Sequence, residues 1–423
     1  MPQPSRPKPP VDSAAQDVRM RGFAARQTVE AALAWLDSHL APLDAEPVPL
    51  GSAAGRVLAE PVTSKVDVPG FDRAMMDGYA VRGEETQGAS SYNTLALAVV
   101  GESLPGRPFA SRVEAGQAVR IMTGAPLPDG ADAVLPAEQV EIREDRILAA
   151  GDVPPGKHVG RRGEDVAAGT VVLSHGRRLR PQDLGVLSSI GQAEVIAVRR
   201  PRVRIVITGN ELLPAGQRPS GHSIADANGP MLAALVERDG GIALNPGIVP
   251  DRADAILAAL GDSAEADVIV VSGGSSVGEE DQAPVLLARH GELAIHGIAM
   301  RPSSPTGMGR LNGRLVFLLP GNPVSCLCAY DFFAGRAIRA LGARPLAWPY
   351  PSIRAPLARK LTSVVGRLDY ARVRIEAGRV EPLAIGGASV LSSTTRADGF
   401  VVIPADSEGY PAGAQVEVNL YEE

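Results

Sequence analysis

Glycine-rich and acidic segments that directly follow short apolar runs are the part of this sequence most suited to chemistry. The segment 272–276 (SGGSS) follows the apolar run 268–271, and the segment 320–325 (PGNPVS) follows the run 316–319. Apolar runs of this length are typical of strands buried on both faces of a parallel sheet. Because loops at the carboxyl ends of parallel strands lie along one edge, where ligands bind, we expect these segments to meet there.

The residue types in these loops indicate an anionic ligand and a metal ion. Closely spaced backbone N–H groups and the serine hydroxyls in 272–276 suit an anion, and Gly321-Asn322-Pro323 offers a second such turn. Glu279, Glu280 and Asp281 follow and have the oxygen ligands that a divalent cation prefers. The alternative is a tight strand–helix turn with a solvated acidic helix start. The pattern favours a small phosphorylated ligand bound with a metal ion.

Two further charged motifs each have a functional and a purely structural interpretation. A pair of cysteines is also close in sequence. Asp72 and Asp77 flank a turn-like segment and suit metal binding or acid–base chemistry, or else form an ordinary Asp-Gly turn. The segment 161–165 (RRGED) either clamps an oxyanion through its guanidinium groups or is a solvated charged turn. Cys326 and Cys328 lie two apart in an apolar helix, on different faces, and are predicted to be buried thiols.

Length, charge and cysteine usage limit the class of protein. A chain of 423 residues exceeds the size of a single core, so more than one domain is expected. The net charge of −6 argues against a general nucleic-acid binder. No apolar run approaches the roughly 18 residues of a membrane span. With two cysteines and no apolar signal core at the start of the chain, we expect a cytoplasmic protein.

Sequence periodicity divides the chain into regions of different expected secondary structure. Residues 1–20 are Pro-rich and polar and are predicted to be disordered, and a helix capped by Thr28 should follow. Short alternating segments separated by turns make 46–155 a compact β-rich module. From Pro201 strands alternate with helices, which predicts a parallel α/β domain. The last 70 or so residues alternate apolar and polar and predict a small β domain.

Six motifs, in their order along the chain, resemble the molybdopterin molybdenumtransferase family, which includes the E domain of gephyrin. The resemblance runs from about residue 24 to the C-terminus. The motifs are FDRAMMDGYAVR (71–82), IMTGAPLPDGADAV (121–134), GRRGEDVAAGTVV (160–172), ITGNELL (207–213), SGGSSVGEED (272–281) and LPGNPVS (319–325). Each motif alone is weak, whereas six in the family's order are strong.

The resemblance implies a multidomain α/β and β fold, with an elongated domain whose sequence is interrupted by the β-rich module. The central domain would be a three-layer parallel α/β molybdopterin-binding domain with Gly-rich loops at strand carboxyl ends. The implied regions are the tail 1–20, the elongated domain 21–45 plus 156–198, the inserted module 46–155, the α/β domain 199–345 and the C-terminal β domain 346–423.

The resemblance also implies a reaction. Molybdate and adenylylated molybdopterin would give molybdenum cofactor and AMP with Mg²⁺, in a homodimer whose site is shared between subunits. A molybdopterin adenylyltransferase and cofactor-accepting enzymes are the implied partners. The implied catalytic residues are Asp77, Thr123, Asp165, Glu211, Asp251 and Asp281, with Asp251 and Asp281 as metal ligands. The implied binding residues are Gly273, Gly274, Ser275, Ser276, Arg301, Pro320, Gly321, Asn322, Pro323 and Ser325.

The sequence departs from the family pattern mainly where cations are usual. The run 301–305 (RPSSP) stands where many members carry Lys-PGKP-type sequences, and Gly297 stands where some carry another Lys. Arg301 keeps one charge, but a planar guanidinium is not equivalent to an ammonium. These departures leave a second hypothesis, a catalytically weak paralogue that carries molybdopterin or cofactor. A third is a scaffold that uses the same fold to bind partners. Whether molybdate or tungstate is preferred also stays open.

Overall fold

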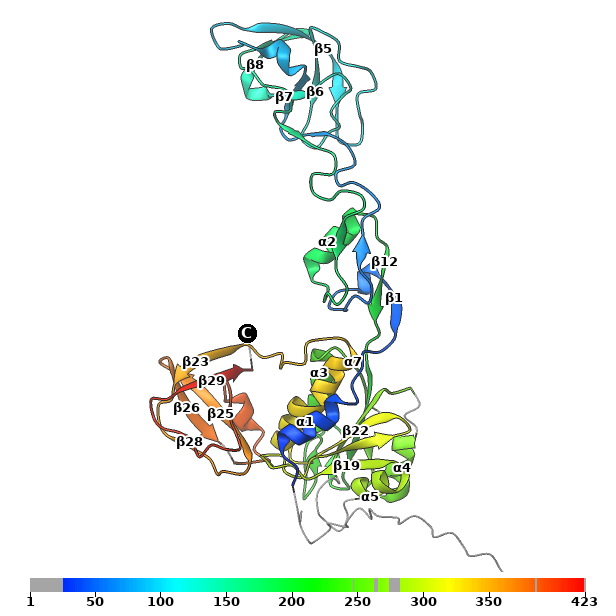
Figure 1. Ribbon diagram of the computed structural model, residues 1–423, viewed down its shortest axis with the longest axis vertical. Coiled ribbons are helices and arrows are strands. Elements are labelled where there is room, and N and C mark those ends of the chain that lie inside the picture. Colours follow the sequence, from blue (N-terminus) through cyan, green and yellow to red (C-terminus); the bar gives the residue numbers. More distant parts are fainter. Residues whose placement is uncertain (1–25, 246, 262–264, 274–281, 385, 422–423) are drawn as a thin grey trace, which may run out of the picture. The chain divides into compact units, whose positions relative to one another are not determined.

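The computed structural model describes residues 26–245, 247–261, 265–273, 282–384 and 386–421 (Figure 1). The predicted disordered tail and the predicted site residues Gly274, Ser275, Ser276 and Asp281 lie outside these ranges. The chain forms two compact units, Met1–Glu46 with Val198–Glu423, and Pro47–Ala197. None of the helices in the described ranges has the length and apolar character needed to cross a membrane.

A seven-stranded mixed sheet is the centre of the first unit. Its strands in spatial order are β16 (Ile242–Leu244), β13 (Arg202–Thr208), β18 (Val268–Ser272), β22 (Arg314–Leu319), β21 (Gly307–Leu311) and β19 (Glu292–His296), and β17 (Ile248–Val249) also pairs with β13. Pairing is parallel as far as β22, with Val203 opposite Val268 and Val270 opposite Phe317. β21 and β19 pair antiparallel, so the prediction of a wholly parallel sheet was wrong at this edge.

The antiparallel edge comes from a two-residue hairpin turn that the sequence analysis missed. Leu311 pairs with Arg314, and the intervening Asn312 and Gly313 both have positive φ, 50° and 81°. Two consecutive positive φ angles define the turn type that Asn-Gly favours, because its twist matches that of the flanking strands. The Asn312-Gly313 pair was therefore the sequence feature from which this hairpin could have been predicted.

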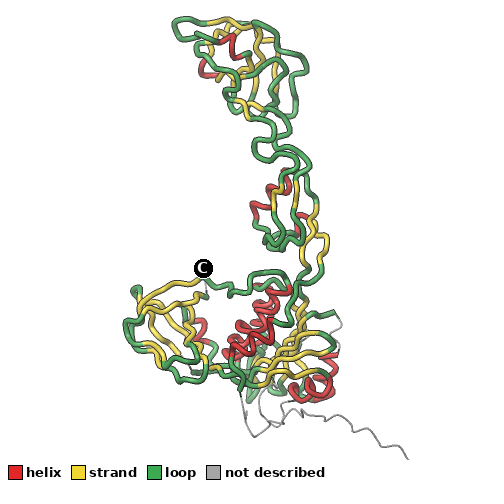
Figure 2. The backbone as a smooth tube through the Cα atoms, in the orientation of Figure 1, coloured by secondary structure: helices red, strands yellow, loops and turns green. Residues whose placement is uncertain are grey.

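Helices cover both faces of this sheet (Figure 2). α3 (Asn228–Arg238), α6 (Pro323–Ala329) and α7 (Gly335–Leu341) pack on the face that carries Val203 and Ile205. α4 (Ala253–Gly261) and α5 (Ala283–His290) pack on the face that carries Val206 and Ile269. Successive side chains of a strand point to opposite faces, so a continuous apolar run supplies both cores.

The first helix, α1 (Val29–Asp37), begins as predicted. The Oγ1 atom of Thr28 accepts a hydrogen bond from the Ala31 amide at 3.1 Å, which satisfies one free N–H of the first turn. Its buried residues Val29, Ala32 and Leu36 join the core of the α/β domain. The sequence analysis had assigned 21–45 to the elongated domain; the apolar face of α1 packs on the α/β domain instead.

The predicted final helix is continuous but contains a π-helical segment, η4 (Tyr330–Ala334), between α6 and α7. The segment is buried throughout. Cys326 and Cys328 are both free and fully buried, as predicted, and burial raises the pKa of the Cys326 thiol to about 12. Neither thiol is therefore ionised near neutral pH.

The C-terminal β domain is joined to the α/β domain by a shared sheet. β20 (Met300–Arg301) pairs parallel with β25 (Leu368–Glu376). The same sheet continues through β27 (Gly399–Ile403), β29 (Gln415–Leu420) and β23 (Ser352–Pro356), with β26 (Arg379–Ala384) pairing β25. Short elements complete this unit: β14 (Leu212–Leu213), β15 (Ile224–Ala225), β24 (Leu361–Thr362), β28 (Gly409–Tyr410) and α8 (Ser392–Thr395).

The unit Pro47–Ala197 contains the predicted β-rich module. Its six-stranded sheet has the order β7 (Ala133–Pro136), β4 (Gly78–Val81), β6 (Gln117–Ile121), β5 (Leu95–Ser103), β9 (Arg146–Ala149) and β8 (Val140–Arg143). A separate core combines Val48, Leu58 and Val62 with Leu173 and Leu187. Residues 48–62 therefore pack with the segment after the module, which they were not predicted to do.

The remaining elements of the chain are short. They are β1 (Ala45–Pro49), β2 (Val62–Thr63), β3 (Arg73–Ala74), β10 (Val159–Gly160), β11 (Val171–Leu173), α2 (Pro181–Ser189) and β12 (Glu194–Val198).

Candidate functional site

A cavity of about 610 Å³ lies where β13, β17, β18 and β22 end. It is the arrangement expected of a parallel sheet, whose loops meet at the carboxyl edge. Of the predicted site residues, the lining includes Glu211, Asp251, Gly273, Pro320, Gly321, Asn322 and Pro323. Thr208, Asp226, Asn228, Pro305 and Ser389 line it as well and were not predicted, whereas Ser272 belongs to the predicted anion-binding segment 272–276.

The glycines of this edge are required by close backbone approach. Gly273 has φ +100°, and a Cβ at that position would lie 2.2 Å from the Thr208 carbonyl oxygen. A Cβ on Gly321 would lie 3.6 Å from the Gly273 Cα. The loops after β13, β18 and β22 are therefore in near contact, which a larger residue at Gly273 would prevent.

Side chains from the start of α3 connect these loops. Asn228 Nδ2 donates to Ser272 Oγ at 2.9 Å and to the Gly321 carbonyl at 2.8 Å. Asp226 Oδ1 accepts from the Gly229 amide at 2.9 Å. The signal that the sequence analysis passed over was Asp-Ala-Asn immediately before a helical pattern, since these residue types favour helix starts.

Three carboxylates line the cavity: Glu211, Asp226 and Asp251. The Asp251 amide donates to Asn210 Oδ1 at 3.2 Å, which fixes Asp251 just after β17. Within the described ranges no three His, Cys, Asp or Glu residues form a ready-made metal cluster. Magnesium, however, usually takes one or two carboxylates and completes its shell with water and substrate phosphates, so these residues fit that ion.

Buried hydrogen-bond donors without an acceptor among the described residues, called the donor group here, lie on β20, on β25 and just after β20. Arg301 Nε, Ser304 Oγ, and Nε and Nη1 of Arg372 are buried and have no acceptor among the described residues. Arg301 is held by Asp369, whose Oδ2 accepts from Nη2 at 3.0 Å, and Arg372 donates Nη2 to the Gly386 carbonyl. Arg372 is fully buried, and burial lowers the pKa of its guanidinium.

Hydrogen bonds from Ser303 and to Ala388 join two neighbouring segments to the helix that follows β22. Ser303 Oγ donates to the Ser325 carbonyl at 2.6 Å, and the Val324 amide donates to the Ala388 carbonyl at 2.9 Å. Ser325, a predicted binding residue, is 3% exposed. Ser304 and Arg372 were not predicted, because an arginine in a β-strand has no local pattern that shows it to be buried.

In the unit Pro47–Ala197 the structure brings Asp77 and Thr123 together. Asp77 Oδ1 accepts from Thr123 Oγ1 at 2.6 Å and from the Thr123 amide at 2.7 Å. These two hydrogen bonds hold the pKa of Asp77 below its usual value. Both side chains are exposed. Position 78, where β4 begins, requires glycine because a Cβ there would lie 2.0 Å from the Leu135 carbonyl oxygen.

The arginines of the RRGED motif are already engaged in ion pairs. Arg161 Nη1 lies 2.7 Å from Asp72 Oδ2, and Arg162 Nε lies 2.7 Å from Asp67 Oδ2. Hydrogen bonds from the Ala168 amide and Arg162 lower the pKa of Asp67, and the Arg162 amide lowers that of Asp72. The motif thus ties 67–72 to 161–168. Asp165 is exposed, and its amide donates to the Val68 carbonyl at 3.1 Å.

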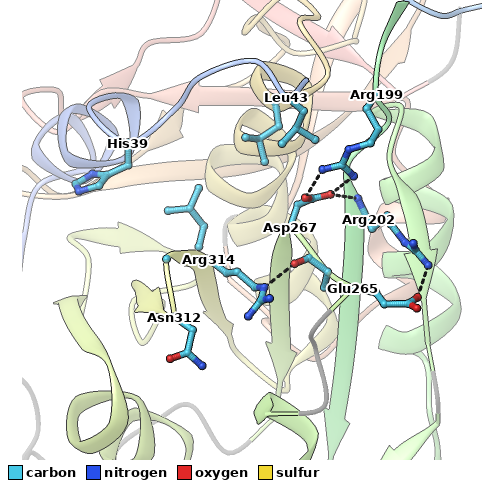
Figure 3. A pocket seen from close by; sticks show the side chains of 12 residues that line it. His39, Leu43, Arg199, Arg202, Glu265, Asp267, Asn312 and Arg314 are labelled. Atoms are coloured by element: carbon cyan, nitrogen blue, oxygen red, sulfur yellow. Dashed lines mark hydrogen bonds and ion pairs between the residues drawn. The ribbon is translucent and has the colours of Figure 1, made fainter. Parts of the chain in front are cut away.

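A second cavity, of about 630 Å³, lies at the amino ends of the same strands (Figure 3). Its charged side chains neutralise one another. Arg199 makes a two-point ion pair with Asp267, at 2.9 and 2.7 Å, and Arg202 pairs with Glu265 at 2.5 Å. The Arg314 Nε donates to the Ala266 carbonyl at 2.8 Å. This cavity is therefore a weaker candidate than the one at the carboxyl edge.

Fold and site together define a multidomain protein with a cavity at the carboxyl edge of the sheet of its α/β domain. Three family models match the chain. Residues 27–191 match the MoeA N-terminal region (domain I and II), residues 204–340 a probable molybdopterin binding domain, and residues 354–421 the MoeA C-terminal region (domain IV).

Curated relatives match nearly the whole chain. It is 35% identical over 387 residues to the molybdopterin molybdenumtransferase of Haemophilus influenzae, covering 90% of this chain and 95% of the relative. It is 36% identical over 386 residues to molybdopterin molybdenumtransferase 2 of Mycobacterium tuberculosis, covering 88% and 94%. Two crystal structures of the molybdopterin biosynthesis MoeA protein of Pyrococcus horikoshii superpose with TM-scores of 0.80 and 0.76 at 34% and 32% identity, covering 94% of this chain and 100% of each.

The chain belongs to the molybdopterin molybdenumtransferase family, and it functions in molybdenum cofactor biosynthesis as a transferase. The resemblance drawn from the six motifs is confirmed.

Proposed function

We propose that this protein transfers molybdenum from molybdate to adenylylated molybdopterin, with release of AMP, in a magnesium-dependent reaction. The observation that carries the proposal is that Arg301, Ser304 and Arg372 each have a buried donor atom without an acceptor among the described residues. Buried donors are normally paired, so donors left without an acceptor indicate a ligand that supplies acceptors.

The donor group suits an oxyanion, a class that includes molybdate and the phosphates of the substrate. Arginine has only donors, and the serine hydroxyl donates readily to an anionic oxygen. Molybdate presents four acceptor oxygens and two negative charges, which two guanidinium groups offset. Arg301 and Ser304 lie in the RPSSP segment, so the arginine and the serines take the place of the lysines found in many relatives. Arg372 supplies a second cation that the motif comparison overlooked.

The cavity at the carboxyl edge suits the pterin and its phosphate. Gly273 and Gly321 allow backbone amides to approach a phosphate closely, as at other Gly-rich loops. Glu211, Asp251 and Asp281 would hold Mg²⁺, which when bound offsets the charge on the pyrophosphate and on leaving AMP. The protein's own contribution is to supply both the anion donors and the carboxylates.

We further propose that the chain acts as a homodimer in which Asp77, Thr123 and Asp165 complete the site of the partner copy. Asp77 and Thr123 are exposed and hydrogen-bonded to each other, and the lowered pKa of Asp77 keeps its carboxylate ionised at neutral pH. A molybdopterin adenylyltransferase would deliver the substrate, and cofactor-accepting enzymes would take the product.

The test is a reconstituted reaction with purified protein, adenylylated molybdopterin, Mg²⁺ and either molybdate or tungstate. AMP release and active cofactor are measured across oxyanion concentrations. We expect AMP release to depend on oxyanion and to saturate. Tight molybdopterin binding with no AMP release at any oxyanion concentration would overturn the proposal and favour a carrier. The ratio of the molybdate and tungstate midpoints measures the oxyanion preference.

A further inference from the structure

The cavity at the carboxyl edge contains two buried polar atoms that no described residue satisfies. They are Oδ1 of Asn228 and Oγ1 of Thr208, and the two side chains are 8% and 3% exposed. An unpaired buried polar atom destabilises a fold, so native proteins keep such atoms where a ligand or water pairs with them. Neither atom belongs to the donor group around Arg372.

The orientation of the Asn228 carboxamide follows from its partners. Nδ2 donates to the Gly321 carbonyl at 2.8 Å and to Ser272 Oγ at 2.9 Å, so both amide hydrogens are used. A carbonyl oxygen only accepts, so exchanging the nitrogen and oxygen of Asn228 would place two acceptors together. The oxygen therefore remains as a fixed acceptor, held by two loops of the cavity.

A fixed neutral acceptor selects one kind of group on a ligand. Phosphate and molybdate oxygens are themselves acceptors and repel it, whereas an N–H group pairs with it. We infer that Asn228 is a specificity-determining residue whose Oδ1 accepts a hydrogen bond from an N–H group on a heterocycle of the bound substrate. The Thr208 hydroxyl pairs with the same ring system. This inference rests on adenylylated molybdopterin being the substrate, in which both the pterin and the adenine carry such N–H groups.

The experiment compares ligands that differ by a single N–H group. Equilibrium binding to the full chain is measured by calorimetry for 6-hydroxymethylpterin and for its analogues with C–H in place of the 2-amino group or of N3–H. A second arm compares AMP with purine ribonucleoside monophosphate, which lacks the amino group. Replacement by C–H adds no bulk, so a change in affinity reports the lost hydrogen bond.

We expect the wild-type protein to bind one parent ligand about tenfold more tightly than its analogue, because the analogue leaves Oδ1 unpaired. A tenfold difference in the pterin series would show that Asn228 contacts the pterin, and one between AMP and its analogue would show that it contacts the adenine. Asn228→Ala should bring that ratio close to one, whatever it does to absolute affinity. Ser272→Ala removes one anchor of the carboxamide but leaves Oδ1 in place, so it should keep most of the ratio.

Three results would overturn the inference: wild-type ratios near one in both arms, a wild-type ratio preserved in Asn228→Ala, or no measurable binding of either parent. Turnover is not needed for any of these measurements. If parent and analogue bind equally well but AMP release is normal, only the role of Asn228 is rejected. If AMP release is absent, the proposed reaction itself is rejected.

Discussion

Arg372 illustrates how one residue can weaken a fold and still be retained. Its side chain is fully buried, yet Nε and Nη1 have no acceptor within the described chain. Replacing a buried charge by an apolar group of similar size is often neutral or stabilising. A buried guanidinium with free donors is best explained by a ligand that binds to it. The contribution of Arg372 to stability and its contribution to oxyanion binding can therefore be measured separately.

Arg372→Met should therefore raise the free energy of unfolding by about 1 kcal/mol or more while abolishing stabilisation by molybdate. Denaturant unfolding with and without molybdate measures both effects. The matched control is Arg374→Met on the same strand, where the arginine is 42% exposed and pairs with Glu376. That variant should keep the molybdate effect. Loss of stability in Arg372→Met together with an intact molybdate effect would contradict the assignment.

The Asp77–Thr123 pair predicts a pH dependence. Hydrogen bonds from Thr123 lower the pKa of Asp77 below its unfolded value of 3.8, so the pair stabilises the fold above that pH. The stabilisation is lost as the pH falls through the lowered pKa. Thr123→Val should raise the pKa of Asp77, whereas Thr123→Ser should keep it low, and carboxyl-carbon NMR titration distinguishes them. An unchanged pKa in Thr123→Val would show that the amide alone is sufficient.

At this scale the sequence predicted acidic and glycine positions better than buried cations. Gly273 and Gly321 were visible because a glycine that directly follows a buried strand usually marks a tight turn or a close backbone approach. Arg372 was not, because its burial depends on Gly386, Phe400 and Tyr421, which are distant in sequence and meet it only in the folded domain. Asn228 was missed for the opposite reason: a helix-start residue has an ordinary local role that conceals a bridge between two distant loops.

The joint between the α/β domain and the C-terminal β domain contains a buried ion-pair network in addition to the pairing of β20 with β25. Asp331, in the π-helical segment, accepts from Arg238 Nη2 at 2.9 Å and from the Tyr350 hydroxyl at 3.0 Å. Trp348 Nε1 donates to the Asp331 carbonyl at 3.0 Å. The segment that contains Trp348 and Tyr350 is thus attached to the π-helical segment by hydrogen bonds.

Breaking this network from one side should be costly because it leaves Arg238 buried with less compensation. Asp331→Ala is expected to lower the free energy of unfolding by about 3–5 kcal/mol. The double variant Asp331→Leu with Arg238→Met should recover much of that loss, since no unpaired charge then remains. Thermal and denaturant unfolding measure both. Arg336→Ala, which breaks the half-exposed pair with Asp37, should cost less than about 1 kcal/mol. Equal losses in the single and double variants would contradict this account.

Element prediction succeeded where one local signal was sufficient. The Thr28 cap and the buried runs of β13, β18 and β22 were read correctly. The antiparallel edge was missed because Gly307–Leu311 contains two glycines and has no strand pattern of its own. Its Gly309 lies against the Glu292 carbonyl, where a Cβ would be 1.8 Å away, so packing and not propensity defines that strand.

At the scale of the whole molecule, the six motifs identified the family although they lie in different units. Asp77, Thr123 and Asp165 belong to Pro47–Ala197, whereas Glu211, Asp251 and Arg301 belong to the unit that contains the α/β domain. Sequence order cannot say whether two such groups act within one chain or between two. In any fold with a module inserted into a longer domain, a functional test is needed to decide whether the two groups of residues act within one chain or between two.

Mixed dimers provide that test. Asp77→Asn and Asp251→Asn should each abolish AMP release in a pure dimer. If each site combines groups from two copies, half of the dimers in an equal mixture are heterodimers, and one of their two sites is intact, so about one quarter of wild-type activity should return. Subunit exchange is verified by differently tagged copies before activity is measured. If the groups act within one chain, every copy carries a defect and no activity returns, and that result would exclude the shared site while leaving the reaction itself untouched.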